Sequence, residues 1–215
     1  MKKSTLILLL FSSIFITNGC KKKPVLTKNE KFLRDSTTLV DIKEYIPEII
    51  VDIRNATKDN MTGSVLYPSN KCYVQKATAE KLKKAQTKLK KMKIGLIIFD
   101  GYRPISIQEQ MWKLVPDDRF IANRDNGDKH SRGASVDVSL VSADGKELNL
   151  GTMYDAYSSE TERYYEGLPE DAKIFRIDIL TQLMLDCGFS CSPSQWWHFD
   201  DTNWENYKPM NYPLK

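Results

Sequence analysis

The sequence predicts an α+β domain in which helices pack on a small antiparallel sheet. Residues 94–100, IGLIIFD, form an apolar run that ends in the turn-forming GYRP, as expected of a buried strand. Residues 133–141, GASVDVSLV, alternate apolar with small polar side chains, the period of a strand that buries one face. The helical patterns are segregated from these strands, which favours α+β with an antiparallel sheet.

Three helices are expected beside the strands. Residues 77–93 carry an apolar stripe at helical spacing, formed by Leu82, Ala85, Leu89 and Met92. Lysines fill the other faces of this helix, as on a solvated surface, with contact to anionic lipid as the alternative. A short helix is expected over 105–115 and an amphipathic helix over 172–186, ended by Gly188. The stretch 194–199, SQWWHF, is then expected to form the last strand, entered through a Ser-Pro-Ser turn.

The N-terminus has the pattern of an export signal. Two lysines precede an apolar run, 6–16, that is too short to span a bilayer but fits a secretory signal. Cys20 follows Gly19 directly and resembles the cysteine that becomes the lipidated N-terminus of bacterial lipoproteins. An ordinary cleaved signal is the alternative, because Thr17 stands where lipoprotein signals usually have leucine.

These features divide the chain into three parts. We expect a lipoprotein-type signal peptide over 1–20, a lysine-rich tether over 21–38 and a folded domain over 39–215. The protein would then be exported and held by a lipid anchor at the periplasmic face of a bacterial membrane.

The charge distribution speaks against nucleic acid as a partner. Five of the 32 basic residues are lysines in the first 23 residues, where there is no acidic residue. The remaining 27 basic residues face 28 acidic ones, so the rest of the chain is close to neutral. A basic surface of the kind that binds nucleic acid is therefore not expected.

Three cysteines remain in the expected domain, an odd number for a compartment that permits disulfides. Cys187 and Cys191 are compatible with a bridge across a helix end or with two free thiols, and Cys72 is expected to be buried. A structural zinc site from Cys187, Cys191 and His198 is a further alternative, but it lacks a fourth ligand.

Four polar residues fall on strand faces or strand ends: Arg103, His130, Asp137 and His198. Two imidazoles and one carboxylate are a common ligand set for catalytic zinc. The spacing alone is weak support, because hydrogen-bonded histidines without a metal are more frequent.

Four motifs together carry a more specific resemblance. FDGYRP (99–104), HSRGASVD (130–137), GTMYDAY (151–157) and WWHF (196–199) resemble, in order, the motifs of the zinc D-alanyl-D-alanine dipeptidases of peptidase family M15. RNATKDNMTG (54–63) resembles the family's N-terminal segment, so the likeness runs from about residue 39 to the C-terminus. The resemblance implies the zinc fold shared by hedgehog and D-Ala-D-Ala peptidases, with one Zn²⁺ per chain.

The resemblance also implies residue roles. His130, Asp137 and His198 would bind the zinc ion, and Arg103 would stabilise the charge that develops on the scissile carbonyl oxygen. Asp155 would pair with the free ammonium of the dipeptide, with a loop-capping carboxylate as the alternative role.

Two positions depart from the family pattern. The family's general base is the glutamate of Glu-Trp-Trp-His, and this chain has Gln195 there, an amide that cannot accept the proton. Asp200 is conceivable as a substitute base. Asn55 stands where family members tend to have a tyrosine that helps to hold the substrate's N-terminus, which leaves the exact dipeptide open.

The expected function is hydrolysis of D-alanyl-D-alanine in the cell envelope, for peptidoglycan turnover or removal of a cell-wall precursor, at a rate lowered by Gln195. The alternative is an inactive member that binds zinc and a D-amino-acid dipeptide or muropeptide. Gln195 itself is compatible with an engineered trap, a natural loss of activity, or an enzyme of reduced or altered activity.

Overall fold

The computed structural model describes residues 38–122, 128–156 and 158–215. The expected signal peptide, with Cys20, lies outside the described residues, as does the tether as far as residue 37. Within the described part, no helix is both long enough and apolar enough to cross a membrane.

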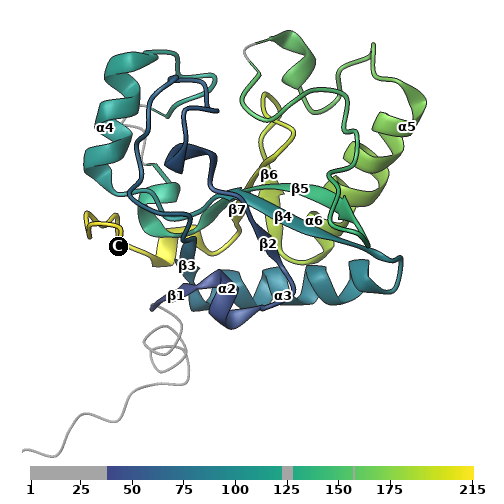
Figure 1. Ribbon diagram of the computed structural model, residues 1–215, viewed down its shortest axis with the longest axis horizontal. Helices are drawn as coiled ribbons and strands as arrows, with labels where there is room; N and C mark the ends of the chain where they lie inside the picture. The colour runs from purple at the N-terminus through teal and green to yellow at the C-terminus, as the bar shows by residue number, and fades with distance from the viewer. Residues whose placement is uncertain (1–37, 123–127, 157) are drawn as a thin grey trace, which may run out of the picture.

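A five-stranded sheet forms the centre of the domain, where the sequence predicted a small antiparallel sheet (Figure 1). Its order is β2-β4-β5-β7-β6, formed by Ile50–Val51, Ile94–Asp100, Ser135–Ser142, His198–Asp201 and Phe189–Cys191. The pairs β4–β5, β5–β7 and β7–β6 are antiparallel. The short edge strand β2 runs parallel to β4, so the sheet is mixed rather than wholly antiparallel.

A smaller antiparallel pair, β1 (Leu39–Asp41) with β3 (Tyr73–Gln75), lies beside the main sheet. The one-turn helix α2 (Ile42–Tyr45) follows β1 directly, and the Asp41 carboxylate caps it by accepting from the backbone N–H of Lys43. These strands were not expected from the sequence, because three-residue strands carry too little periodicity.

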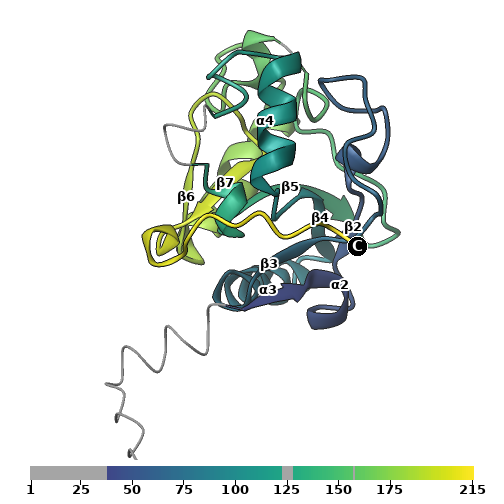
Figure 2. The same ribbon diagram turned by 90° about the vertical axis from the view of Figure 1, so that its left-hand side faces the viewer.

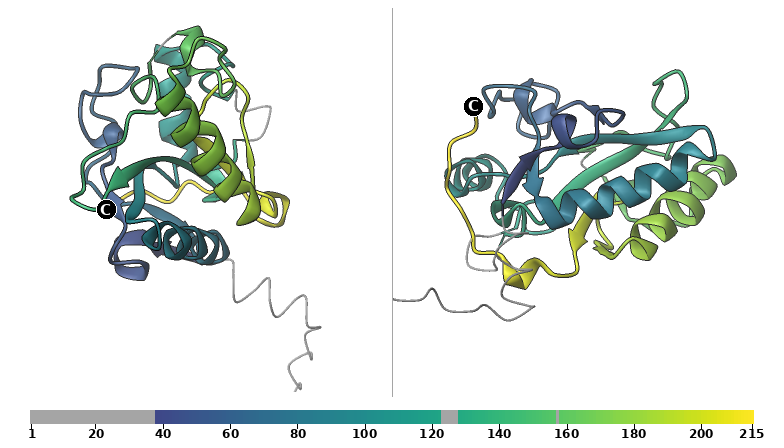
Figure 3. Two further views of the ribbon diagram at one scale, coloured as in Figure 1. Left: turned by 90° about the vertical axis from the view of Figure 1, so that its right-hand side faces the viewer. Right: turned by 90° about the horizontal axis from the view of Figure 1, so that it is seen from below.

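The helices flank the sheet on both sides. Helix α3 (Lys76–Lys90) runs along one face, and α4 (Ile105–Leu114) lies on the other (Figures 1 and 2). A third helical stretch consists of α5 (Glu170–Lys173), a π-helical segment (Ile174–Thr181) and α6 (Gln182–Asp186). This stretch lies next to α3 on the same face of the sheet (Figure 3).

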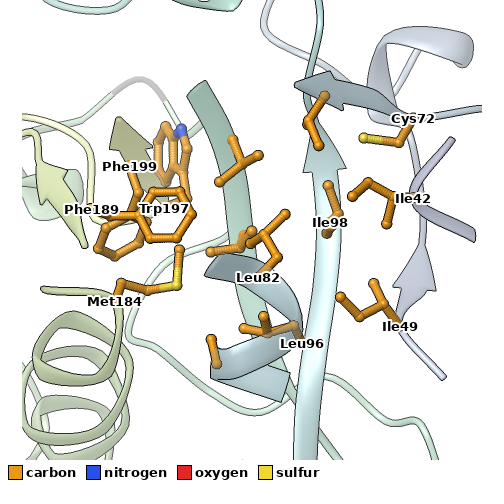
Figure 4. Packing of buried hydrophobic residues seen from close by; sticks show 14 of the residues in the cluster. Ile42, Ile49, Cys72, Leu82, Leu96, Ile98, Met184, Phe189, Trp197 and Phe199 are labelled. Atoms are coloured by element: carbon orange, nitrogen blue, oxygen red, sulfur yellow. The ribbon is translucent and has the colours of Figure 1, made fainter. Parts of the chain in front are cut away.

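Most apolar residues of the predicted patterns lie in the main core, but Met92, expected on the stripe of the 77–93 helix, is exposed because α3 ends at Lys90. Leu82 of α3 packs among Leu96 and Ile98 of β4, and Met184 of α6 lies against Phe189 and Trp197 (Figure 4). The apolar face of β5, Val136, Val138 and Leu140, belongs to the same cluster. The opposite face of β5 is left to Ser135, Asp137 and Ser139, as the period of two predicts.

The structure corrects the expected bounds of the last strand and decides the state of the cysteines. The last strand is shorter than expected, because Trp196 and Trp197 lie in a turn and β7 begins only at His198. This turn is closed by the N–H of His198, which donates to the carbonyl of Gln195 at 3.3 Å. Cys187 and Cys191 are free thiols, and Cys72 is buried as expected.

Gly133 provides the turn that connects a short 3-10 helix (His130–Arg132) to β5. Its φ is +66°, and a Cβ there would lie 2.7 Å from Leu39 Cδ2. We expect Gly133→Ala to lower the free energy of unfolding by about 1–3 kcal/mol, through the left-handed backbone and the steric contact.

Denaturant unfolding measures this change, and Gly63→Ala is a matched control. Gly63 has nearly the same φ, +63°, but a Cβ there has no neighbour within 4 Å. The Gly63 variant should therefore lose less stability. Equal losses would show that only the backbone conformation matters.

Candidate metal and substrate site

Three predicted ligands meet above the polar face of the sheet. Asp137 on β5 and His198 on β7 are paired directly across the two strands, so their side chains leave the same face. The turn at Gly133 folds the preceding 3-10 helix back and brings His130 to the same point. Within the described residues, these three form the one group of such side chains close enough to share an ion.

The distances between the donor atoms test whether an ion fits. His130 Nε2 lies 3.3 Å from His198 Nδ1, His198 Nδ1 lies 3.0 Å from Asp137 Oδ1, and His130 Nε2 lies 3.6 Å from Asp137 Oδ1. Metal–ligand bonds of about 2.0–2.1 Å in a tetrahedral zinc site require donors about 3.3–3.4 Å apart. The three atoms therefore match three corners of such a tetrahedron. The cysteines 187 and 191 are not part of this group.

Both imidazole rings are fixed by a second hydrogen bond. His130 Nδ1 donates to the Gly101 carbonyl at 2.7 Å, which leaves Nε2 with its lone pair for the ion. His198 Nε2 donates to Asp200 Oδ1 at 3.0 Å, which leaves Nδ1. Asp200 also accepts from Lys129 Nζ and Ser135 Oγ, each at 2.6 Å. This carboxylate therefore orients an imidazole, and its oxygens are engaged by three donors.

The charges of this cluster support one another. Burial opposes ionisation of Asp137, but His130 and His198 outweigh it and hold the pKa of this carboxyl well below its usual value. Burial likewise disfavours a charged His198, yet Asp200 and Asp137 raise its pKa to about 10. In the absence of metal His198 is therefore protonated at neutral pH, and a bound cation would take the place of the proton on Nδ1 beside the ionised Asp137.

Asp200→Asn tests the orienting role of this carboxylate. An amide at this position no longer holds the His198 ring as a charged acceptor, so we expect metal affinity to fall by about 10–100-fold. Competition with a chromophoric chelator measures the affinity. An unchanged affinity in a folded variant would contradict the role.

Arg103 reaches the site from the end of β4 and is itself held by Asp100. Its Nε lies 3.1 Å from Asp100 Oδ2, its Nη2 contacts the same oxygen, and Nη1 donates to Gln108 Oε1 at 2.8 Å. These bonds use three of the five guanidinium N–H groups. Burial works against the charged form, but the Asp100 carboxylate raises the pKa of Arg103 well above its usual value.

Asn55 contacts the same Asp100 carboxylate and is fully buried. Its amide donates to Asp100 Oδ2 at 2.9 Å, and Tyr67 donates to Asp100 Oδ1 at 2.9 Å. In this structure Asn55 therefore supports the Asp100–Arg103 pair, and it is not among the residues that line the cavity described next.

A cavity of about 390 Å³ opens over the three ligands, a volume that accommodates a small molecule. Six predicted residues line it: Arg103, His130, Asp137, Asp155, Gln195 and His198. The turn that begins at Pro193 brings Gln195 into the same cavity as His198, although the two are three apart in sequence.

Asp155 lies on the cavity wall in a left-handed backbone conformation, φ +58°. Its Oδ2 accepts from the backbone N–H of Met61 at 3.3 Å. Burial, and secondarily the negative charge of Asp137, raise the pKa of Asp155 to about 7. A cationic group placed against this carboxylate would relieve both effects.

Gln195 is buried, and its side-chain amide is already engaged. Its Nε2 donates to the carbonyl of Phe120 at 3.0 Å. The adjacent Ser194 hydroxyl donates to the carbonyl of Arg119 at 3.1 Å. Both bonds connect the turn before β7 to the segment 119–120.

Some residues at the site were not predicted from the sequence. Tyr154 donates to Asp137 Oδ2 at 3.1 Å, Lys129 pairs with Asp200, and Asp100 carries Arg103. Tyr154 and Asp100 lie inside recognised motifs, which was the available signal for them. No local pattern identifies Lys129.

Comparisons with known proteins give matches over most of the chain. The model of the peptidase M15 family, described as D-ala-D-ala dipeptidase, matches residues 35–212. The D-alanyl-D-alanine dipeptidase of Escherichia coli K12 is 30% identical over 182 residues, covering 85% of this chain and 91% of that protein. The D-alanyl-D-alanine dipeptidases of Enterococcus faecalis V583 and Streptomyces coelicolor are each 28% identical and covered over 88% of their lengths.

Proposed function

Because the chain belongs to the D-Ala-D-Ala dipeptidase family of M15 peptidases, we propose that it binds one zinc ion and D-alanyl-D-alanine, and cleaves the dipeptide slowly. The observation that carries this proposal is the triangle of donor atoms 3.0–3.6 Å apart, open to a cavity that also holds Arg103 and Asp155. When bound there, zinc would polarise the amide carbonyl and lower the pKa of a bound water.

Arg103 is proposed to stabilise the negative charge that develops on the carbonyl oxygen. Two of its N–H groups remain beyond those bound to Asp100 and Gln108, and its position on the cavity wall suits a bond to that oxygen. The Asp100 carboxylate keeps the guanidinium from turning away. Loss of one such donor typically lowers kcat by about 10²–10³-fold.

Asp155 is proposed to bind the ammonium of the dipeptide, which would restrict the substrate to one with a free N-terminus. Removing one partner of a buried charge pair costs about 2–5 kcal/mol. We therefore expect Asp155→Asn to weaken D-alanyl-D-alanine binding by at least about 30-fold. Calorimetric titration of the zinc-loaded protein measures this loss, and an unchanged affinity would rule out the ammonium contact.

Ionisation of the Asp155 carboxylate should make the dipeptide affinity depend on pH. Its pKa is about 7, so below pH 7 it is protonated and cannot pair with an ammonium. Dipeptide affinity should therefore rise as the pH increases through about 7. Burial is the larger cause of the raised pKa of Asp155, so this pKa stays raised when a cation neutralises Asp137. The other charged or titratable groups near Asp155 are Arg103, Asp100 and Tyr154.

The contribution of Asp155 to the free energy of unfolding changes with pH in the opposite direction to the dipeptide affinity. The folded chain keeps the proton of Asp155 between about pH 4 and 7, whereas the unfolded chain releases it, so this group's contribution to stability falls as the pH rises across that window. In metal-free protein, Asp155→Asn should remove this slope. Thermal unfolding of both proteins from pH 4 to 8 measures it.

Gln195 is the reason why slow turnover is expected. An amide orients a water by hydrogen bonds but does not take its proton. General acid–base catalysis is worth about 10²–10⁴ in rate, so its loss leaves only electrostatic and positional contributions.

A second candidate function is binding without cleavage. The engagement of Gln195 Nε2 by the Phe120 carbonyl favours it, because the amide is used as a structural donor at the position of the base. Such a protein would hold a D-amino-acid dipeptide or muropeptide in a zinc-dependent manner. For either function we propose the cell envelope as the location, with export and a lipid anchor at Cys20 as the sequence predicts.

D-alanine release from D-alanyl-D-alanine by the zinc-loaded full chain tests the proposal, with L-alanyl-L-alanine as the control. We expect slow, zinc-dependent release from the D,D dipeptide alone. Zinc-dependent binding without any release would support the second candidate. Neither binding nor release would exclude both.

A further inference from the structure

The turn 192–198 carries Gln195 and ends at His198, the first residue of β7. Residues 192–197 have no helix or strand, yet the turn positions two residues of the site. Arg163, whose side chain is wholly buried, bonds this turn at several points. We infer that Arg163 is a positioning residue: it holds this turn so that His198 and Gln195 face the same cavity. The inference rests on the proposed metal site and names a residue that acts through others.

Arg163 donates to three carbonyls of this one turn. Its Nε bonds the Ser192 carbonyl at 2.9 Å, and its Nη2 bonds the carbonyls of Gln195 at 2.8 Å and His198 at 2.9 Å. Its own backbone N–H donates to the Pro193 carbonyl at 2.8 Å. One planar side chain thus spans the turn from its first residue to its last.

Neighbouring contacts hold the guanidinium in place. Nη1 donates to the Thr181 hydroxyl at 2.9 Å, and the guanidinium carbon lies 4.4 Å from the centre of the Phe199 ring. Thr181 in turn donates to the carbonyl of Arg176, five residues earlier in the π-helical segment. π-Helical segments occur frequently at functional sites, and this one supplies the acceptor that orients Arg163.

All of these described acceptors are neutral, so the position is costly for a cation. Burial lowers the pKa of Arg163 to about 10, and a buried charge without a carboxylate is unfavourable. An apolar side chain would fill the space without that cost. It would leave the turn carbonyls of Ser192 and Gln195 without these bonds, and the turn would lose its fixed shape.

Arg176 offers a matched control. It is also wholly buried, its pKa is also lowered to about 10 by burial, and it lies 5.4 Å from the centre of the Trp196 ring. Its described acceptors are the carbonyls of Leu150, Glu160 and Glu162 and the hydroxyl of Thr152. None of these acceptors belongs to the turn 192–198, which Arg176 contacts through the Trp196 ring instead. Arg176→Lys therefore keeps the bonds from Arg163 to the turn carbonyls and reports the general effect of replacing a buried arginine.

The test compares Arg163→Lys with Arg176→Lys in the full chain. Thermal unfolding of the metal-free proteins measures the structural effect, chelator competition measures Zn²⁺ affinity, and the visible absorption of Co²⁺-loaded protein reports ligand geometry. We expect both variants to unfold at lower temperature. Only Arg163→Lys should weaken Zn²⁺ binding, by about tenfold or more, and change the Co²⁺ spectrum.

Equal changes in the two variants, or an unchanged affinity and spectrum in Arg163→Lys, would overturn the inference. If Arg163→Lys does not fold, Thr181→Val can replace it, because it removes one acceptor of the Arg163 guanidinium and keeps the charge of Arg163. Thr181→Val should weaken Zn²⁺ binding by at least about twofold. An unchanged affinity would contradict the inference. Wild-type protein that binds neither metal would instead refute the proposed function, so the two failures are distinguishable.

Discussion

Gln195→Glu is expected to raise the rate of D-alanyl-D-alanine hydrolysis by about 10²–10⁴-fold, the usual contribution of general acid–base catalysis. The reason is that every other part of the proposed machinery is present: the donor triangle, Arg103 on the Asp100 carboxylate, and Asp155 in the lining of the cavity. Release of D-alanine by the zinc-loaded variant and wild type, measured side by side, gives the ratio.

The variant also loses a hydrogen bond. A carboxylate cannot donate to the Phe120 carbonyl as Gln195 Nε2 does, so the segment 119–120 should be held less firmly and the melting temperature should fall. Gln195→Ala is the control, because it removes the same bond without adding a base, and it should stay slow.

Other ratios of the two rates would show which assignment is wrong. Equally fast wild type and variant would mean that Gln195 does not occupy the position of the base, and Asp200 would be examined next despite its bond to His198. Two inactive proteins would put the dipeptide in doubt. Asn55 would then be the position to vary, since the family pattern differs there.

His198→Ala is expected to remove zinc binding, with a loss of affinity greater than the roughly 10–100-fold typical of outer partners such as Asp200. The substitution deletes one of three donors and leaves Asp137 with a single imidazole. Metal content after dialysis measures the loss, and hydrolysis or zinc-dependent dipeptide binding should disappear with it.

The matched control replaces Cys187 and Cys191 with serine. These thiols are outside the donor group, so the double variant should keep its zinc. Loss of zinc from the double variant would instead indicate the cysteine-based structural site considered from the sequence, which also uses His198.

The parts of the fold that local patterns specify were predicted well. The run IGLIIFD is strand β4 with the expected bounds, and the alternation over 133–141 places Asp137 on the face opposite Val136 and Val138, as observed. These predictions succeeded because strand period and burial are local properties of the chain. The helix over 172–186 was also expected, although its π-helical centre was not.

The parts that failed depend on contacts between distant segments. Strand β2 pairs parallel to β4, and Trp196 and Trp197 lie in a turn that Arg163 holds from 29 to 35 residues away in sequence. An arginine that bonds backbone carbonyls leaves no sequence signal, because any residue supplies a carbonyl. The ligand set came from the resemblance, and spacing alone would not have selected it.

We propose that the donor triangle holds zinc and that the cavity above it binds D-alanyl-D-alanine. Calorimetric titration of the dipeptide into zinc-loaded and metal-free protein at pH 8 tests both parts together. We expect one dipeptide bound per chain in the zinc-loaded protein, much weaker binding without zinc, and no binding of L-alanyl-L-alanine. Equal binding with and without zinc, or no binding of the D,D dipeptide to the loaded protein, would contradict it.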